Sequence, residues 1–152
     1  THAGSHFTSR QLFKNALFEN SKGGFAGKIV VKHGAMFTDA EQTNRNIVDG
    51  EMARMITAPQ LEIYCDEVKC SHGATTGQLD ERAMFYMQAR GIPADEARRM
   101  LTQAFMVDVI DSITFEVLRQ RLHLLVEKRL SGTAAGCDTC ATACHSDLQE
   151  PV

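Results

Sequence analysis

The first half of the chain alternates apolar and polar residues, as strands do. Phe25, Ile29 and Val31 lie on one side of an extended segment that ends in β-branched residues, and this spacing predicts a strand. The segment 61–72 alternates more regularly and predicts the clearest strand of the sequence. Because Cys65 lies on the apolar face of this segment, we expect it to belong to the core.

Two other segments have a weaker pattern. Residues 9–17 fit either a strand or a helical turn, before the Gly23-Gly24 pair interrupts them. Residues 38–46 are almost entirely polar, although apolar segments flank them. They fit a solvated loop, or a strand edge whose side chains bond to neighbouring backbone. Composition favours the loop, because Asn and Asp satisfy turns more often than they build strands.

From residue 79 onward the apolar spacing is helical. Three helices are predicted: one that ends at Arg90-Gly91, one that Pro93 opens, and one that ends at Gly132. Their apolar positions are Leu79, Ala83, Tyr86 and Met87, then Ala97, Met100, Leu101, Ala104 and Phe105, then Phe115, Leu118, Leu122, Leu125, Val126 and Leu130. Short strands that are not interleaved with helices favour a sheet stack or solenoid followed by a helical part.

Composition excludes several classes of protein. The 152 residues are 43% hydrophobic and 23% charged with a net charge of −3, as in a soluble globular protein without excess positive charge for nucleic acid. The length suits one domain or two small units. No apolar run is long enough for a membrane span and the start lacks a signal-peptide core, so we expect a cytoplasmic protein. The start at Thr1, without a methionine, suggests a piece of a longer protein.

The cysteines provide the first candidates for chemistry. There are five, an odd number with irregular spacing, which favours reduced thiols or metal ligands over a disulfide framework. Cys70 and His72 are two residues apart, so in a strand both side chains point the same way and can act on one ion or one partner group. Taken alone, such a pair is more often a buried thiol beside a hydrogen-bonded imidazole. Cys65 lies on the opposite face from Cys70 if the strand is straight.

The segment 133–152 has no apolar period, and we expect it to be disordered without a bound metal or partner. It carries four soft ligands that could bind zinc or part of an iron–sulfur cluster, namely Cys137, Cys140, Cys144 and His145. Their spacing does not match the usual ligand spacing of zinc sites or of iron–sulfur clusters. A metal-binding or redox module centred on these residues is the alternative function.

The chain has no local signature of an enzyme. It contains no G-x-G-x-x-G, Walker A or Gly-x-Ser-x-Gly motif, which removes the usual signs of nucleotide binding and serine hydrolysis. The acidic pairs Asp80-Glu81 and Asp95-Glu96 fit helix starts better than acid/base pairs. We therefore expect no self-contained active site.

Four segments of the sequence resemble segments of a known protein family. Segments 27–31, 38–46, 59–77 and 85–93 read GKIVV, TDAEQTNRN, PQLEIYCDEVKCSHGATTG and FYMQARGIP. They resemble the C-terminal part of the SufB/SufD family, scaffold subunits of the SUF iron–sulfur cluster assembly complex, and among these the SufD type. The resemblance runs from about Phe7 to Leu130.

The resemblance implies a fold that composition does not. Residues 1–78 would form the last turns of a right-handed single-stranded parallel β-helix and residues 79–132 a C-terminal helical domain. Residues 133–152 are left as a cysteine-containing tail, to which the resemblance does not extend. The resemblance also places residues 38–46 in the β-helix, against the loop that composition favours. As partners it implies SufB, met through the β-helix ends, and the SufC ATPase, docked by the helices. The open end of a shortened β-helix could also pair with a second copy.

The resemblance also implies a site. The family's interface histidine, implicated in cluster assembly with a SufB cysteine, falls on His72, and the neighbouring thiol on Cys70. We expect them to contribute to a site for transient iron or a nascent cluster that SufB completes, with no cofactor bound tightly to the isolated chain. Phe37 and Ala58 stand where the family often has lysine, and the tail after Gly132 lies outside the family pattern.

Overall fold

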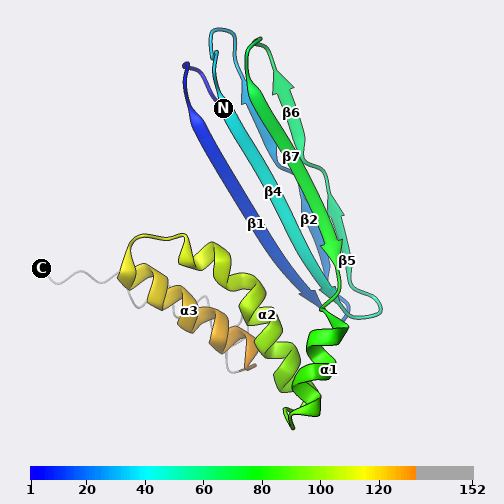
Figure 1. Ribbon diagram of the computed structural model, residues 1–152. Coiled ribbons are helices and arrows are strands. Elements are labelled where there is room, and N and C mark those ends of the chain that lie inside the picture. Colours follow the sequence, from blue (N-terminus) through cyan, green and yellow to red (C-terminus); the bar gives the residue numbers. More distant parts are fainter. Residues whose placement is uncertain (133–152) are drawn as a thin grey trace, which may run out of the picture. The chain divides into compact units, whose positions relative to one another are not determined.

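The computed structural model describes residues 1–132, whose strands form three parallel sheets (Figure 1). The strands are β1 (Thr8–Phe18), β2 (Lys22–Phe25), β3 (Lys28–Val31), β4 (Asp39–Asp49), β5 (Arg54–Thr57), β6 (Gln60–Ile63) and β7 (Lys69–Gly77). The helices are α1 (Glu81–Ala89), α2 (Ala94–Asp111) and α3 (Glu116–Leu130). Strands followed by helices are the predicted class of fold.

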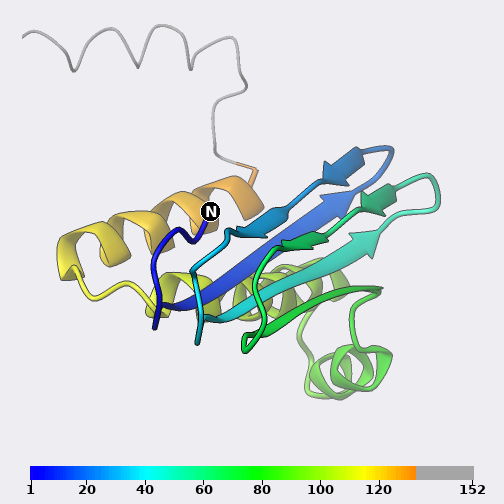
Figure 2. The same cartoon turned by 90° about the horizontal axis from the view of Figure 1, so that it is seen from above.

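The strands repeat in the order long, short, short. Each pairs with its equivalent one repeat later: β1 with β4, β4 with β7, β2 with β5, and β3 with β6. Thr8 lies beside Asp39 and Asp39 beside Lys69, so one repeat takes about 30 residues. Figure 2 shows the long strands side by side in one layer and the short strands in a second layer. The chain therefore coils, and its interior lies between these layers.

The apolar part of the interior is small. Its main cluster contains Ile29, Val31, Ala35 and Ala40, which are at most 2% exposed, and Leu17 and Ala53 are buried apart from it. The half-buried side chains packed against it are Leu61, Cys65, Val68 and Cys70. β-Branched residues at alternate positions of β3 supply the centre of this cluster, which confirms that Ile29 and Val31 share a buried face.

The composition-based prediction of a loop at residues 38–46 was wrong, because these residues enter β4, the central strand of the long sheet. Gln42, Asn44 and Asn46 point into the coil and are buried, and hydrogen bonds among polar side chains replace the usual apolar contacts. The strand implied by the family resemblance is confirmed. Residues 9–17, left open between strand and helix, belong to β1.

Two predicted strands are each interrupted. The segment 25–31 divides into β2 and β3, and the segment 61–72 divides into β6 and the start of β7. Because the chain turns between β6 and β7, Cys65 and Cys70 both pack against the apolar cluster. The opposite faces expected for a straight strand therefore do not arise, whereas the expected contact of Cys65 with the core is confirmed.

The three predicted helices are present. Asp80 caps α1 by accepting hydrogen bonds from the backbone N–H groups of Arg82 and Ala83. Gly91 and Gly132 follow α1 and α3 with φ of 88° and 72°, a conformation that favours glycine. The expected buried stripe of α2 is only partly buried: Ala97 is fully buried, but Met100 is 45% exposed.

The chain divides into two compact units, Thr1–Val109 and a second that begins at Ile110. The strands end at Gly77, yet α1 and most of α2 belong to the same unit as the strands. The predicted division between residues 78 and 79 thus marks a change of secondary structure. As a domain boundary it stays a prediction.

Candidate functional site

β7 is an edge strand among the residues that the structure describes. It pairs with β4 on one side only, and all its residues from Ser71 to Gly77 are exposed. Paired residues of neighbouring parallel strands point to the same face, with about 4.8 Å between the strands. The even-numbered residues of β7 therefore continue the inward rows of β4. These pairs are Ala40 with Cys70, Gln42 with His72, Asn44 with Ala74, and Asn46 with Thr76.

Cys70 occupies the apolar end of this inward face. It lies beside Ala40, is half-buried, and packs against the cluster that contains Ile29 and Val31. The thiol is free. Because apolar side chains already cover part of Cys70, it suits an auxiliary role beside the exposed His72.

His72 has a different environment from Cys70. It lies beside Gln42, which is only 2% exposed, yet His72 itself is exposed because its strand is at the edge. Gln11 of β1 completes the row on the other side of Gln42. His72 is thus the exposed end of a row of polar side chains that runs into the coil.

Amide side chains form a layer inside the coil. Asn15 Nδ2 donates to Asn46 Oδ1 at 2.8 Å, and Asn46 Nδ2 donates to Asn44 Oδ1 at 2.7 Å. Asn46 Nδ2 also lies 3.0 Å from the carbonyl oxygen of Thr75 and 3.3 Å from Thr76 Oγ1, so it ties β4 to β7. These bonds hold the edge strand against its neighbour in one register.

Two buried amide atoms of this layer have no hydrogen-bond partner among the described residues: Gln42 Oε1 and Asn44 Nδ2. Buried polar groups are nearly always paired, so these two mark a place where a polar group can bind. Sequence analysis missed both residues. The sequence did contain a sign of them: Gln42, Asn44 and Asn46 recur at every second position, as residues on one face of a strand do.

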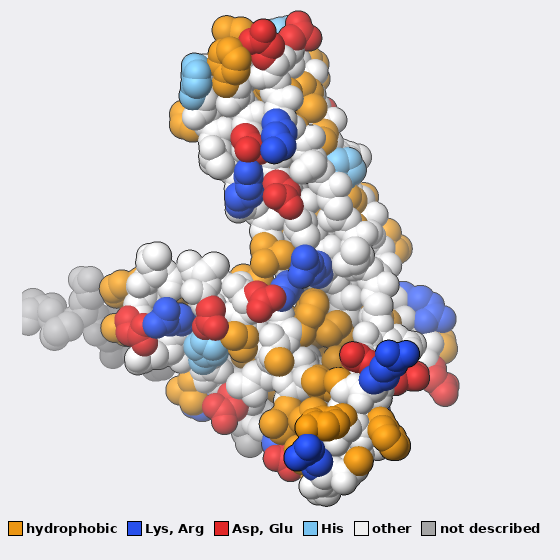
Figure 3. Space-filling view, viewed as in Figure 1, with side chains coloured by type: hydrophobic (Ala, Val, Ile, Leu, Met, Phe, Trp, Pro, Cys, Tyr) orange, Lys and Arg blue, Asp and Glu red, His pale blue; other side chains and the backbone are white. Residues whose placement is uncertain are grey.

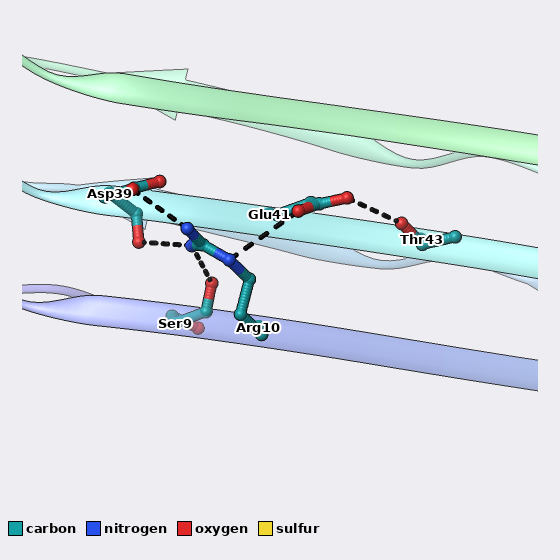
Figure 4. Close-up of polar contacts among 5 residues, drawn as sticks. All are labelled: Ser9, Arg10, Asp39, Glu41 and Thr43. Carbon is teal, nitrogen blue, oxygen red and sulfur yellow. Dashed lines mark hydrogen bonds and ion pairs between the residues drawn. The ribbon is translucent and has the colours of Figure 1, made fainter. Parts of the chain in front are cut away.

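The opposite, outward face of the sheet carries an ion-pair cluster (Figure 4). Arg10 Nη2 lies 2.9 Å from Asp39 Oδ2, Arg10 Nη1 donates to the Asp39 carbonyl oxygen at 3.0 Å, and Arg10 Nε lies 3.6 Å from Glu41 Oε2. The hydrogen bond from Arg10 lowers the pKa of Asp39 and raises the pKa of Arg10 itself. The cluster joins β1 to β4. Because its side chains face away from His72, it does not belong to the candidate site.

Lys14 fastens α2 to the outward face of β1. Its side chain is 2% exposed; Nζ donates to the Phe105 carbonyl oxygen at 2.6 Å and forms an ion pair with Asp108. Nζ also lies 4.7 Å from the centre of the Phe105 ring. The hydrogen bond from Lys14 lowers the pKa of Asp108. A second ion pair, at 3.1 Å, joins Arg98 of α2 to Asp49 at the end of β4.

A pocket of about 470 Å³ lies where the strands give way to the helices. Asp49 and Glu51 line it from the end of β4, Met84 and Phe85 from α1, and Arg98 from α2. Neither Cys70 nor His72 lines this pocket, so it is separate from the predicted site residues.

Within residues 1–132, no three His, Cys, Asp or Glu side chains are grouped so that they could hold a metal ion. The other candidate ligands, Cys137, Cys140, Cys144 and His145, lie outside the described residues, as does the whole segment 133–152. None of the described helices has the length and apolar character needed to span a membrane.

Comparison with known proteins places these features in a family. Residues 1–105 match the family model described as "SUF system FeS cluster assembly, SufBD core domain". The chain is 40% identical over 126 residues to the iron-sulfur cluster assembly protein SufD of Escherichia coli, and 40% identical over 124 residues to a SufBD family iron-sulfur cluster assembly protein of Synechocystis. It is 30% identical over 120 residues to the SufD of Bacillus subtilis.

These matches cover 83%, 82% and 78% of this chain, but only 30%, 27% and 28% of the respective relatives. The chain thus spans about a third or less of the length of the curated relatives that it matches. The family match itself covers the coil, α1 and the first part of α2. The chain is a member of the SufBD core domain family of the SUF system for iron–sulfur cluster assembly.

Proposed function

We propose that the chain is part of a non-enzymatic, cytoplasmic scaffold subunit that assembles iron–sulfur clusters with a SufB-like subunit and a SufC-like ATPase. Family membership supports this proposal, as do the names of the relatives, which are iron–sulfur cluster assembly proteins. The family resemblance supplies the partners. The cluster is the cargo of such a scaffold and is held only in transit.

The fold we propose for the strand region is the end of a right-handed parallel β-helix. Support comes from the three parallel sheets, in which every strand pairs with its equivalent one repeat later. In this fold each turn covers the previous one, and β7 is where a further strand would pair. We propose that a strand of the SufB-like subunit pairs there.

The observation that carries the proposed site is the contrast between Gln42 and His72. Both occupy the same inward row, but Gln42 is 2% exposed whereas His72, on the edge strand, is exposed. A partner strand on β7 would enclose His72 as β7 encloses Gln42. Imidazole and thiolate both bind iron, and His72 with Cys70 provides two of the four ligands that such a centre commonly has. The partner would provide the rest.

Complementation in cells that depend on this pathway tests the site. We expect His72→Ala to abolish or strongly reduce cluster assembly and Cys70→Ala to reduce it less. Ser71→Ala is the matched control, because Ser71 lies between them on the same exposed strand and faces outward. Normal assembly by both the His72 and the Cys70 variants would contradict the proposed site.

The helices provide the surface that we propose for the ATPase. Helix α1 has no buried residue, and its Phe85 and Tyr86 are 73% and 58% exposed. Figure 3 shows hydrophobic side chains gathered over this helix. Exposed aromatic side chains in a group are typical of protein interfaces.

Co-purification tests this surface. Phe85→Asp should abolish retention of the SufC-like ATPase, whereas Ile56→Asp, which introduces the same charge at a 74% exposed residue of β5, should not. Equal retention by both variants and the unmodified protein would remove α1 from the proposed interface.

A further inference from the structure

One unpaired amide atom inside the coil, that of Gln42, lies in the row that ends at His72, and the other, that of Asn44, lies in the next inward row. Gln42 is 2% exposed and Asn44 fully buried, and neither Gln42 Oε1 nor Asn44 Nδ2 has a partner among the described residues. An unpaired buried amide atom costs about 1–3 kcal/mol. Two of them, one acceptor and one donor, on alternate residues of one strand face indicate a binding position for a small polar group.

The orientation of the Gln42 amide is fixed from two sides. Its Nε2 donates to Gln11 Oε1 at 2.9 Å, which directs Oε1 away from β1. Gly27 makes room for Oε1: a Cβ atom at position 27 would lie 2.5 Å from Oε1 and 2.8 Å from Cδ. The acceptor is therefore held in place by a hydrogen bond and by backbone.

The Asn44 amide is oriented in the same way. Its Oδ1 already accepts from Asn46 Nδ2 at 2.7 Å, so its Nδ2 is the group that remains. A water molecule can accept two hydrogen bonds and donate two, so one water between Asn44 Nδ2 and Gln42 Oε1 would satisfy both. Ala74 of β7 lies beside Asn44, and its methyl side chain offers no hydrogen-bond partner to Asn44 Nδ2.

We propose that Gln42 is a positioning residue for His72, acting through one buried water molecule that Asn44 Nδ2 also binds. The water donates to Gln42 Oε1, accepts from Asn44 Nδ2, and accepts a second hydrogen bond from the inward N–H of the His72 ring. The proton is thereby fixed on the inward ring nitrogen, and the outward nitrogen keeps its lone pair. Metal-binding histidines commonly donate their other N–H in this manner. Iron binding by the outward nitrogen rests on the proposed function. The hydrogen bonds of the water to Gln42, Asn44 and His72 do not depend on that function.

The tautomer of His72 is the test. The complete gene product is labelled with ¹⁵N-histidine, and the ring nitrogen shifts are read at alkaline pH, where imidazole is neutral. Comparison with His72→Ala identifies which ring nitrogen signals belong to His72. We expect a single dominant tautomer in the unmodified protein, a mixture in Gln42→Met, and recovery in Gln42→Glu, which keeps an acceptor oxygen.

Thr38→Val is the control, because Thr38 is a buried residue just before β4 whose hydroxyl donates to the Ala35 carbonyl oxygen at 2.7 Å, away from His72. An unchanged tautomer ratio in a folded Gln42→Met protein would overturn the proposal. If that variant does not fold, a high-resolution crystal structure of the unmodified protein decides: a water within about 3.2 Å of Gln42 Oε1, Asn44 Nδ2 and a His72 ring nitrogen is expected. Absence of that water would equally overturn it.

These measurements need neither cluster nor partner, so the two proposals can fail separately. Normal complementation by His72→Ala would contradict the proposed site but leave the tautomer result standing. If both proposals hold, Gln42→Met should lower cluster assembly about 10- to 100-fold, the usual effect of removing a group that orients a metal ligand.

Discussion

Gly27 shows how one residue of the chain constrains the interior of the coil. It follows β2 and needs no left-handed backbone; its α-carbon faces the Gln42 amide so closely that even a methyl group would collide with it. Glycine is required here by space. The neighbouring Gly24 is different, because a Cβ atom there would meet nothing within 4 Å.

This difference gives a matched pair of substitutions. Gly27→Ala should lower the free energy of unfolding by about 1–3 kcal/mol, because the buried amide must move and lose its bond to Gln11. Gly24→Ala should change it by less than about 1 kcal/mol. Urea denaturation followed by circular dichroism measures both, and equal effects would show that the collision at position 27 is relieved elsewhere.

The ion pairs of Asp39 and Asp108 predict an acid-sensitive part of the stability. Hydrogen bonds from Arg10 and Lys14 hold the pKa of these carboxyl groups below the usual value. A lowered folded-state pKa contributes stability above the unfolded-state pKa of about 3.9, and this contribution is lost as the pH falls through the folded-state value. We expect the free energy of unfolding to decline below about pH 4.

The double variant Asp39→Asn/Asp108→Asn should show a shallower decline over the same pH range. Because both carboxylates are exposed, the difference should be small and should shrink in high salt. The control is Asp66→Asn/Glu67→Gln, which removes the same charge from two exposed residues just before β7, outside these ion pairs and outside the helices. An identical acid response of the two double variants would contradict the assignment.

At the scale of the elements, the burial of each strand depends on its position within the repeat. Ile29 of β3 is 2% exposed at the centre of the apolar cluster, whereas Ile56 of β5 is 74% exposed. Both are isoleucines in four-residue strands of parallel two-stranded sheets. The difference lies in the face of the strand: Ile29 shares its face of β3 with the buried Val31, whereas Ile56 shares its face of β5 with the exposed Arg54.

The same substitution at these two residues should therefore have very different effects. Ile29→Ala should lower the free energy of unfolding by about 2–5 kcal/mol, since it leaves a cavity in a small cluster. Ile56→Ala should change it by less than about 0.5 kcal/mol. Chemical denaturation of both variants is the measurement, and a large effect at Ile56 would indicate that a contact covers it.

The sequence predicted elements well where periodicity alone decides, as in α1 and in Ile29 and Val31 of β3. It failed where partners in space decide. Residues 42–46 have the composition of a loop, and only the pairing of amides across β1, β4 and β7 makes them a strand interior. Likewise, the two-residue spacing predicted that Cys70 and His72 share one face. It did not predict the contact of Cys70 with the apolar cluster.

At the scale of the whole molecule, local patterns left both a sheet stack and a solenoid open, because each strand bonds to residues about 30 positions away. Only the strings that resemble a family implied parallel strands. The resemblance was also needed for His72. The spacing made His72 one of several candidate site residues, and the resemblance made it the preferred one. The division after Val109 was not predicted, since it falls within one continuous helix, α2.

The exposed edge of β7 predicts self-association when the natural partner is absent. Of its nine residues only Lys69 is permanently charged, so little opposes pairing with a second copy. Gly73→Lys should weaken the dimer about tenfold or more by placing a charge at this edge, in a position where a side chain meets nothing within 4 Å. Sedimentation velocity over a range of concentrations measures the effect.

Thr43→Lys is the control for this experiment, because Thr43 is the neighbour of Gly73 on the central strand β4, which has no free edge. A dimer that both variants weaken equally, or a protein that is monomeric at all concentrations, would show that β7 does not pair with itself.

The repeat of about 30 residues also determines how long the ribosome takes to synthesise each turn. At a synthesis rate of about 5–20 residues per second, one further turn emerges roughly every 2–6 seconds, long compared with the formation of a strand pair. Each turn can therefore settle on the one before it while the next is still being made. Until its successor is made, the newest long strand of the coil has one edge without a partner, and β7 is the last such strand among the described residues.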